Sequence, residues 1–128
     1  MSVLLDTHAA LWLVQGDSRL SRKALERVSA LDREDIYVSD LMLFELGLLV
    51  SKGRVVIEGE LAQFLREFAG HFTILPLDPG IAALAVELSL PQADPFDRIF
   101  VATAAWHKLP LVTRDREIRR SGIVDTIW

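Results

Sequence analysis

Four acidic residues that lie far apart in the chain stand at places where carboxylates can do chemistry, namely Asp6, Glu45, Asp97 and Asp115. A cluster of carboxylate oxygens favours hard cations such as Mg²⁺ or Mn²⁺ over zinc. Such an ion polarises a phosphoryl oxygen, lowers the pKa of an attacking water and stabilises the leaving oxygen. The four acids therefore predict metal-dependent phosphodiester hydrolysis, provided that the fold brings them together.

Two of these acids follow expected strands. Asp6 comes directly after the apolar run 3–5, and Asp115 comes two residues after a run that ends near Thr113. In a parallel sheet flanked by helices, ligands bind beyond the carboxyl ends of the strands. Each acid could instead be only a loop or capping residue, and this alternative is strongest for Asp115 because a short helix is expected at 115–120.

Glu45 lies within an almost uninterrupted apolar stretch, residues 41–50, that we expect to be helical. A helix that is apolar all round is usually buried. An unpaired buried carboxylate is costly. Glu45 therefore points either into a polar pocket, toward a metal ion or an arginine, or into a structural salt bridge.

The segment 94–98 contains two acids and a helix start. Pro95 suits the first helical position, so Asp94 is expected as the N-cap and Asp97 at the third position. We interpret Asp94 as a cap only, like Asp78 before the preceding helix, which also begins with proline. Asp97 is either the reciprocal partner of Asp94 in an arrangement like a capping box or an acid that faces the sheet edge.

The elements that would position these acids alternate between strands and helices. We expect strands at 3–5, 36–38, 72–75, 111–113 and 124–127, and helices at 9–14, 21–31, 40–52, 60–69, 78–88, 94–107 and 115–120. This alternation predicts an α/β sandwich around a mostly parallel sheet, with residues 1–128 in one domain.

Composition narrows the class of protein. The chain has 128 residues, 51% of them hydrophobic, and no cysteine, which excludes disulfides and thiolate zinc sites. A net charge of −4 argues against a broadly basic protein that coats nucleic acid, but not against a nuclease with an acidic metal site. Without a signal peptide or a long apolar run, we expect a soluble, cytoplasmic protein with no membrane contact. The mean hydropathy of +0.29 predicts that another chain covers some of the apolar surface.

Other site chemistries find less support. The three histidines show no ligand-like spacing, and no Gly-rich phosphate loop or Gly-x-Ser-x-Gly turn occurs. A phosphoryl-transfer domain of the receiver or haloacid-dehalogenase kind would need a second acid near Asp6 and a well-placed lysine, whereas Lys108 precedes the fourth expected strand. A non-catalytic binding module that keeps the acids for stability stays open as an alternative.

These motifs together resemble the PIN-domain family, and in particular the VapC-type toxins of bacterial toxin–antitoxin systems. The resemblance covers almost the whole chain. It rests on Leu4-Leu5-Asp6-Thr7-His8, Leu11-Trp12, Val38-Ser39, Glu45, Gly53-Arg54, Asp94-Pro95-Phe96-Asp97-Arg98, Val101-Ala102-Thr103-Ala104 and Leu109-Pro110-Leu111-Val112-Thr113-Arg114-Asp115. It implies a three-layer α/β/α fold with a parallel sheet, and a Mg²⁺- or Mn²⁺-dependent endoribonuclease.

The resemblance also implies roles for the acids. Asp6 and Asp97 would be the principal metal ligands, Asp115 a further ligand, and Glu45 a ligand or a holder of water. Three hydroxyl residues would support them by hydrogen bonds or act only as caps and strand ends: Thr7, Ser39 and Thr113. The partners implied are an RNA substrate, a small cognate antitoxin and a second copy of the chain in a homodimer.

RNA binding requires positive charge near the acids, because phosphate contacts dominate affinity. Five arginines close to Asp97 and Asp115 in sequence are candidates: Arg98, Arg114, Arg116, Arg119 and Arg120. A solvated helix end is an equal alternative for Arg119 and Arg120. Trp12 is expected in the core, and the alternative is that it lines a groove for an antitoxin or a second copy.

Overall fold

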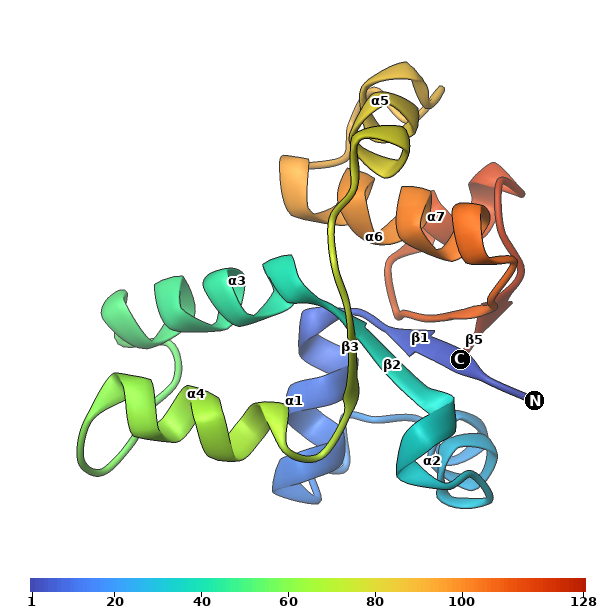
Figure 1. The fold of residues 1–128 in the computed structure, drawn as a ribbon. Helices are drawn as coiled ribbons and strands as arrows, with labels where there is room; N and C mark the ends of the chain where they lie inside the picture. The colour runs from blue at the N-terminus through green and yellow to red at the C-terminus, as the bar shows by residue number, and fades with distance from the viewer.

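Five parallel strands form one central sheet in the computed structural model, which describes residues 1–128 (Figure 1). The strands lie in the order β3-β2-β1-β4-β5, and every neighbouring pair is parallel. Their bounds are β1 Val3–Leu5, β2 Ile36–Ser39, β3 Thr73–Leu75, β4 Leu111–Val112 and β5 Thr126–Ile127. The mostly parallel sheet expected from the sequence is thus confirmed, with β5 as a paired edge strand.

Helices connect the strands and cover both faces of the sheet. They are α1 Thr7–Gln15, α2 Arg22–Ser29, the 3-10 helix η1 Arg33–Asp35, α3 Asp40–Ser51, α4 Leu61–Ala69, α5 Pro79–Glu87, α6 Pro95–His107 and α7 Arg116–Ser121. Parallel crossovers are right-handed, so the change of direction after β3 moves the later helices to the other face. In Figure 1, α5, α6 and α7 lie above the sheet and α1, α2 and α4 below it, which confirms the three-layer α/β/α sandwich.

The centre of the sheet is the point where the chain changes direction. β1 pairs with β2 on one side and with β4 on the other, and the three residues of β1 are fully buried. The chain adds β2 and β3 on one side and β4 and β5 on the other. The carboxyl ends of β1 and β4 therefore flank a topological switch point, the usual ligand site of such sheets.

Side-chain caps begin six of the seven α-helices and explain where they start. The capping residues are Asp6, Ser21, Ser39, Asp78, Asp94 and Asp115. Because Asp6 caps α1, that helix begins at Thr7, two residues before the expected start. The cap predicted at Asp78 is confirmed by its bond with the Ile81 amide at 2.9 Å.

Helix α3 is less buried than its apolar sequence predicts. Only Met42 and Leu46 are buried, and the Phe44 side chain is 60% exposed. Figure 1 gives the reason: α3 and α4 run side by side away from the sheet, so part of α3 has no layer above it. No helix is long and apolar enough to span a membrane, the longest having 13 residues.

Candidate active site

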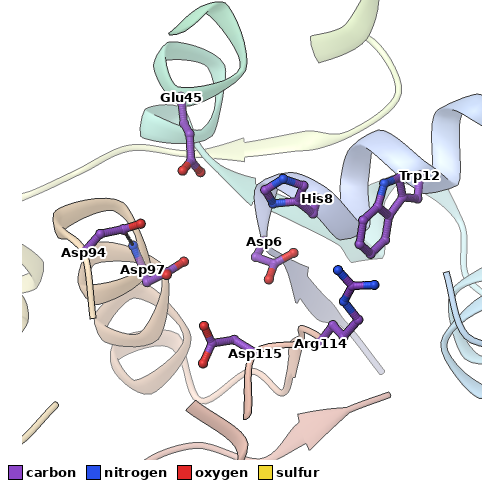
Figure 2. A pocket seen from close by; sticks show the side chains of 8 residues that line it. All are labelled: Asp6, His8, Trp12, Glu45, Asp94, Asp97, Arg114 and Asp115. Atoms are coloured by element: carbon purple, nitrogen blue, oxygen red, sulfur yellow. Dashed lines mark hydrogen bonds between the residues drawn. The ribbon is translucent and has the colours of Figure 1, made fainter. Parts of the chain in front are cut away.

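A pocket of about 240 Å³ lies at the carboxyl edge of β1 and β4 and collects all four acids expected to act together (Figure 2). It is lined by Asp6, His8, Trp12, Glu45, Asp94, Asp97, Arg114 and Asp115. Five of these eight side chains are carboxylates, and they come from the end of β1, from α3, from the start of α6 and from the turn after β4. The fold therefore brings together acids that are up to 109 positions apart in the sequence.

Asp6 is both a helix cap and a pocket residue. One carboxylate oxygen accepts the Ala9 amide hydrogen at 2.9 Å, and the side chain is only 9% exposed. Burial raises the pKa of Asp6 from 3.8 to about 6, against the hydrogen bonds of the Thr113 side chain and the Ala9 amide. Asp6 therefore caps α1 and lines the pocket with the same carboxylate.

The Asp97 side chain does not form the capping-box arrangement with Asp94 that was one of its two predicted roles. The Asp94 carboxylate accepts the Asp97 amide hydrogen at 2.8 Å, but the Asp97 carboxylate makes no return bond. It lies instead in the pocket opposite Asp6 (Figure 2). Burial, followed by repulsion from Asp94 and then Asp6, raises the pKa of Asp97 from 3.8 to about 7.

Glu45 points into the polar pocket rather than into a salt bridge. The Thr7 hydroxyl donates a hydrogen bond to its carboxylate, and no arginine or lysine pairs with it. Burial raises the pKa of Glu45, while the bond from Thr7 acts in the opposite direction. Of the two roles that the resemblance left open for Thr7, the structure shows the hydrogen bond to an acid of the pocket.

The Thr113 hydroxyl fixes the turn after β4 in which Asp115 lies. The Asp115 amide donates to Thr113 Oγ1 at 3.1 Å, and the Asp115 carboxylate caps α7 by accepting the Ile118 amide hydrogen at 3.0 Å. Asp115 is therefore a cap and a pocket residue at once. Ser39, by contrast, only caps α3 through the Leu41 amide.

Three pocket residues were not predicted from the sequence. Asp94 was interpreted as a cap only, His8 was set aside for lack of ligand-like spacing, and Trp12 was expected in the core. Trp12 is indeed buried at 3% exposure, yet its edge reaches the pocket. His8 and Trp12 are four residues apart on α1, with ring centroids separated by 5.5 Å. The i, i+4 spacing of His8 and Trp12, close after Asp6, is the sequence pattern that could have predicted both rings at the site.

Positive charge lies at one side of the acids. The Arg114 guanidinium sits 4.7 Å from the centroid of Trp12 and lines the pocket (Figure 2). Three further exposed arginines on α7 surround a second hollow of about 290 Å³: Arg116, Arg119 and Arg120. Arg114 and these three stay candidates for phosphate contacts.

Arg98 is different, and the expectation that it contacts phosphate is wrong. Its guanidinium donates to four backbone carbonyls, at 2.6–3.0 Å, that lie at the end of α5 and in the following turn. Those carbonyls belong to Ala85, Val86, Leu88 and Leu90. The donors of Arg98 are therefore occupied in joining α6 to α5.

Replacing Arg98 by Met is expected to lower the free energy of unfolding by about 2–4 kcal/mol, because the carbonyls at the end of α5 lose charged donors. Urea unfolding followed by circular dichroism measures the change. Arg119→Met is the matched control, since Arg119 is exposed and bonds to no other side chain; it should cost less than about 0.5 kcal/mol. Equal effects of the two substitutions would contradict this role of Arg98.

The donor set of the pocket fits a hard divalent cation, because all of its acidic groups offer oxygen. The carboxylates do not form a complete set of metal ligands in this structure, because no three His, Asp or Glu side chains are arranged to hold one ion. Burial and, after it, repulsion from the neighbouring carboxylates raise the pKa of Asp97, and the repulsion disfavours closer approach of the like charges. A bound cation would remove that repulsion.

The pocket does not suit the phosphoryl-transfer alternative. No lysine lines it. Lys108 follows the end of α6 and precedes β4, and it borders a different hollow with Leu109 and Pro110. Parallel strands place their starts and their ends at opposite edges of a sheet, so Lys108 lies at the wrong edge to reach Asp6.

Comparison with known proteins agrees with this architecture. The family described as "PIN domain" matches residues 3–123. Ribonuclease VapC22 of Mycobacterium tuberculosis is 36% identical, across 99% of this chain and 98% of its own length.

Solved structures show the same fold. A toxin-antitoxin complex from Klebsiella pneumoniae is 25% identical with a TM-score of 0.69, covering 96% of this chain and 95% of that chain. FitAcB from Neisseria gonorrhoeae is also 25% identical, with a TM-score of 0.71 over 97% of this chain and 95% of that chain. VapBC2 from Rickettsia felis, at 19% identity, has a TM-score of 0.74 over 98% of this chain and 97% of that chain. With its switch-point acids, parallel sheet and matching sequence, the chain belongs to the PIN domain family.

Proposed function

We propose that the chain is a metal-dependent endoribonuclease that acts as the toxin of a toxin–antitoxin pair. The observation that carries the proposal is the convergence of Asp6, Glu45, Asp97 and Asp115 on one pocket at the switch point of the sheet. The 36% identity to Ribonuclease VapC22 supports RNA as the substrate. The pocket has room and oxygen ligands for a cation, which an acidic site needs before it can accept a phosphate.

Asp6 and Asp97 would hold Mg²⁺ or Mn²⁺ as principal ligands, with Asp115 as a further ligand. When bound, the ion supplies Lewis-acid polarisation of the phosphoryl oxygen and a lower pKa for an attacking water. Glu45, held by the Thr7 hydroxyl, is placed to orient that water or to ligate the ion. Thr113 fixes the turn that carries Asp115.

Arg114 is the charged side chain of the pocket that can attract the RNA backbone. It is exposed, and no acidic side chain forms an ion pair with it. The three arginines of α7 extend the positive surface beyond Asp115. Because phosphate contacts release counterions, binding through these residues should weaken steeply as salt rises.

The same proposal includes protein partners. The similar structure from Klebsiella pneumoniae is described as a toxin-antitoxin complex, which supports a cognate antitoxin for this chain. Two exposed apolar side chains, Val56 between α3 and α4 and Val86 on α5, support contact with an antitoxin or with a second copy. A homodimer, or a larger toxin–antitoxin assembly in the cytoplasm, is the arrangement that we propose.

The experiment that tests the proposal is RNA cleavage by the purified chain with and without divalent ions. We expect cleavage with Mg²⁺ or Mn²⁺, none with a chelator, and recovery when the ion is restored. Saturation with Mn²⁺ at about a hundredfold excess over its dissociation constant should also stabilise the fold by roughly 2.7 kcal/mol.

Asp6→Asn, purified in the same way, is the control for contaminating nucleases and should show neither effect. Mapping of RNA 5′ ends after brief induction in cells would then identify the substrate. A wild-type protein that binds RNA but never cleaves it with either ion would instead indicate a non-catalytic binding module.

A further inference from the structure

Arg114 is a positive side chain that stands among acids and pairs with none of them. Five carboxylates line the pocket, and Arg114 is the one arginine or lysine there. The structure contains two ion pairs, Arg19 with Asp17 and Arg22 with Glu26, and Arg114 takes part in neither. A flexible guanidinium beside several carboxylates is expected to bond to one of them. Another contact must therefore hold it away from the acids.

That contact is with the ring of Trp12. The guanidinium carbon of Arg114 lies 4.7 Å from the ring centroid, which is within the range of a cation–π interaction. Figure 2 shows Trp12 and Arg114 together on one side of Asp6, with Asp97 and Glu45 on the other. Both Trp12 and Arg114 line the pocket. The ring thus competes with the acids for the guanidinium.

The ring of Trp12 is itself fixed in place. It is 3% exposed and belongs to the main core, and the ring of Trp128 lies against it with centroids 6.0 Å apart. A second guanidinium, that of Arg19, lies 5.1 Å from the centroid of Trp12, but it is bonded to Asp17 at 2.8 Å and does not line the pocket. Of the two cations on this ring, Arg114 is the one that borders the acids.

We propose that Trp12 is a positioning residue that holds Arg114 away from the pocket carboxylates, so that they stay open to a cation and the guanidinium stays open to a phosphate. This inference rests on the proposed function and assigns a role in it to a ring that touches neither the ion nor the reacting atoms. Without the ring, the guanidinium would form charge-assisted hydrogen bonds with Asp6 or Asp115. It would then compete with the metal ion for the same oxygens.

The test is the affinity for Mn²⁺, measured by isothermal titration calorimetry at pH 8 on wild type, Trp12→Leu, Arg114→Met and the double variant. Trp12→Leu should weaken Mn²⁺ binding by about 10- to 100-fold, as loss of a residue that supports metal ligands does. Arg114→Met alone should not weaken it, because the change removes a positive charge from beside the ligands.

The double variant distinguishes positioning from a merely structural role. If Trp12 acts through Arg114, the double variant should regain the Mn²⁺ affinity of Arg114→Met to within about twofold, because the competing guanidinium is gone. If Trp12 only supports the fold of the site, the loss seen in Trp12→Leu will persist in the double variant. That persistence would overturn the proposal.

Arg114→Lys gives a second test that leaves the buried ring intact. A lysine ammonium is a compact, strongly hydrated charge that lacks the planar stacking of a guanidinium on an aromatic face, so it should turn to the acids. We expect Arg114→Lys to bind Mn²⁺ about two- to fivefold more weakly than wild type, although the charge is the same. An unchanged affinity would contradict the proposal, even if Trp12→Leu failed to fold.

Arg19→Met is the matched control. It removes the other guanidinium that lies on Trp12, at a place outside the pocket. The Mn²⁺ affinity should change by less than about twofold, as for most substitutions of exposed side chains. A loss as large as that of Trp12→Leu would show that disturbance of the ring, and not the position of Arg114, controls the site.

Further outcomes separate this inference from the proposed function. If the variants bind Mn²⁺ as expected but wild type cleaves no RNA, the positioning role is supported and the nuclease function is not. If wild type cleaves RNA while Trp12→Leu and Arg114→Lys bind Mn²⁺ as wild type does, the inference fails and the nuclease stands. A wild type that binds neither Mn²⁺ nor Mg²⁺ overturns both.

Discussion

Asp97→Asn is expected to abolish RNA cleavage and, at the same time, to stabilise the metal-free protein. Asp97 is one of the two proposed principal ligands, so its loss should reduce kcat by more than the roughly 10- to 100-fold that is typical when a residue only supports a ligand. The thermal stabilisation by Mn²⁺ should disappear with it. Asparagine has nearly the same shape, so the fold around α6 should persist.

The gain in stability follows from the sign of the pKa shift. The pKa of Asp97 is raised from 3.8 to about 7 in the folded protein, so the folded state binds this proton more tightly than the unfolded state. Stability is therefore highest when the group is protonated and falls as pH rises toward 7. At pH 8 the charge acts fully against folding, and its removal should raise stability by about 1–2 kcal/mol, or roughly 3–8 °C in Tm.

Asp94→Asn is the matched control for this experiment. It removes a neighbouring charge of the same pocket, and asparagine caps a helix as well as aspartate does. We expect most of the cleavage activity to remain in that variant. The assignment of Asp97 would be contradicted if both variants lost activity equally, or if metal-free Asp97→Asn were no more stable than wild type at pH 8.

The affinity for Mn²⁺ is expected to fall by about 20-fold between pH 8 and pH 6, because a cation competes with protons for its carboxylate ligands. The pKa of Asp6 is about 6 and that of Asp97 about 7, so both are ionised at pH 8 and largely protonated below pH 6. Ordinary carboxylates would show almost no change over this range. RNA cleavage should show the same loss at acidic pH.

Isothermal titration calorimetry over this pH range measures the affinity, and two buffers with different ionisation enthalpies give the number of protons released. We expect roughly one to two protons per ion near pH 6. In Asp94→Asn the curve should move to lower pH, because repulsion from Asp94 is the largest charge effect on the pKa of Asp97. A flat affinity from pH 8 to pH 6 would show that neither Asp6 nor Asp97 is a ligand.

Much of the architecture could be predicted because it depends on local patterns. The run 3–5 is apolar on every residue, as a strand covered on both faces must be, and it is fully buried. Asp78 and Asp94 before proline predicted the starts of α5 and α6 from capping chemistry alone. The placement of Asp6 at a strand end followed from the same reasoning.

Local patterns could not predict which polar groups find partners in space. The sequence placed Arg98 beside an acid, whereas the structure directs its guanidinium to the carbonyls of α5, because α5 packs against α6. An apolar stretch predicted a buried α3, whereas only Met42 and Leu46 of that helix are buried and Phe44 is 60% exposed. These outcomes depend on contacts between distant elements.

The acidic residues show most clearly what the sequence determined and what only the tertiary structure decided. Their residue types, their positions at helix starts and strand ends, and the kind of cation they suit were determined by the sequence, since capping and ligand chemistry are local. Only the tertiary structure decided that Asp94 joins the pocket and that the Asp97 carboxylate stays free of the cap. The parallel pairing of β1 with β4 brings Asp6 and Asp115 to the same edge of the sheet, and the packing of α3 and α6 beside that edge adds Glu45 and Asp97 to the site.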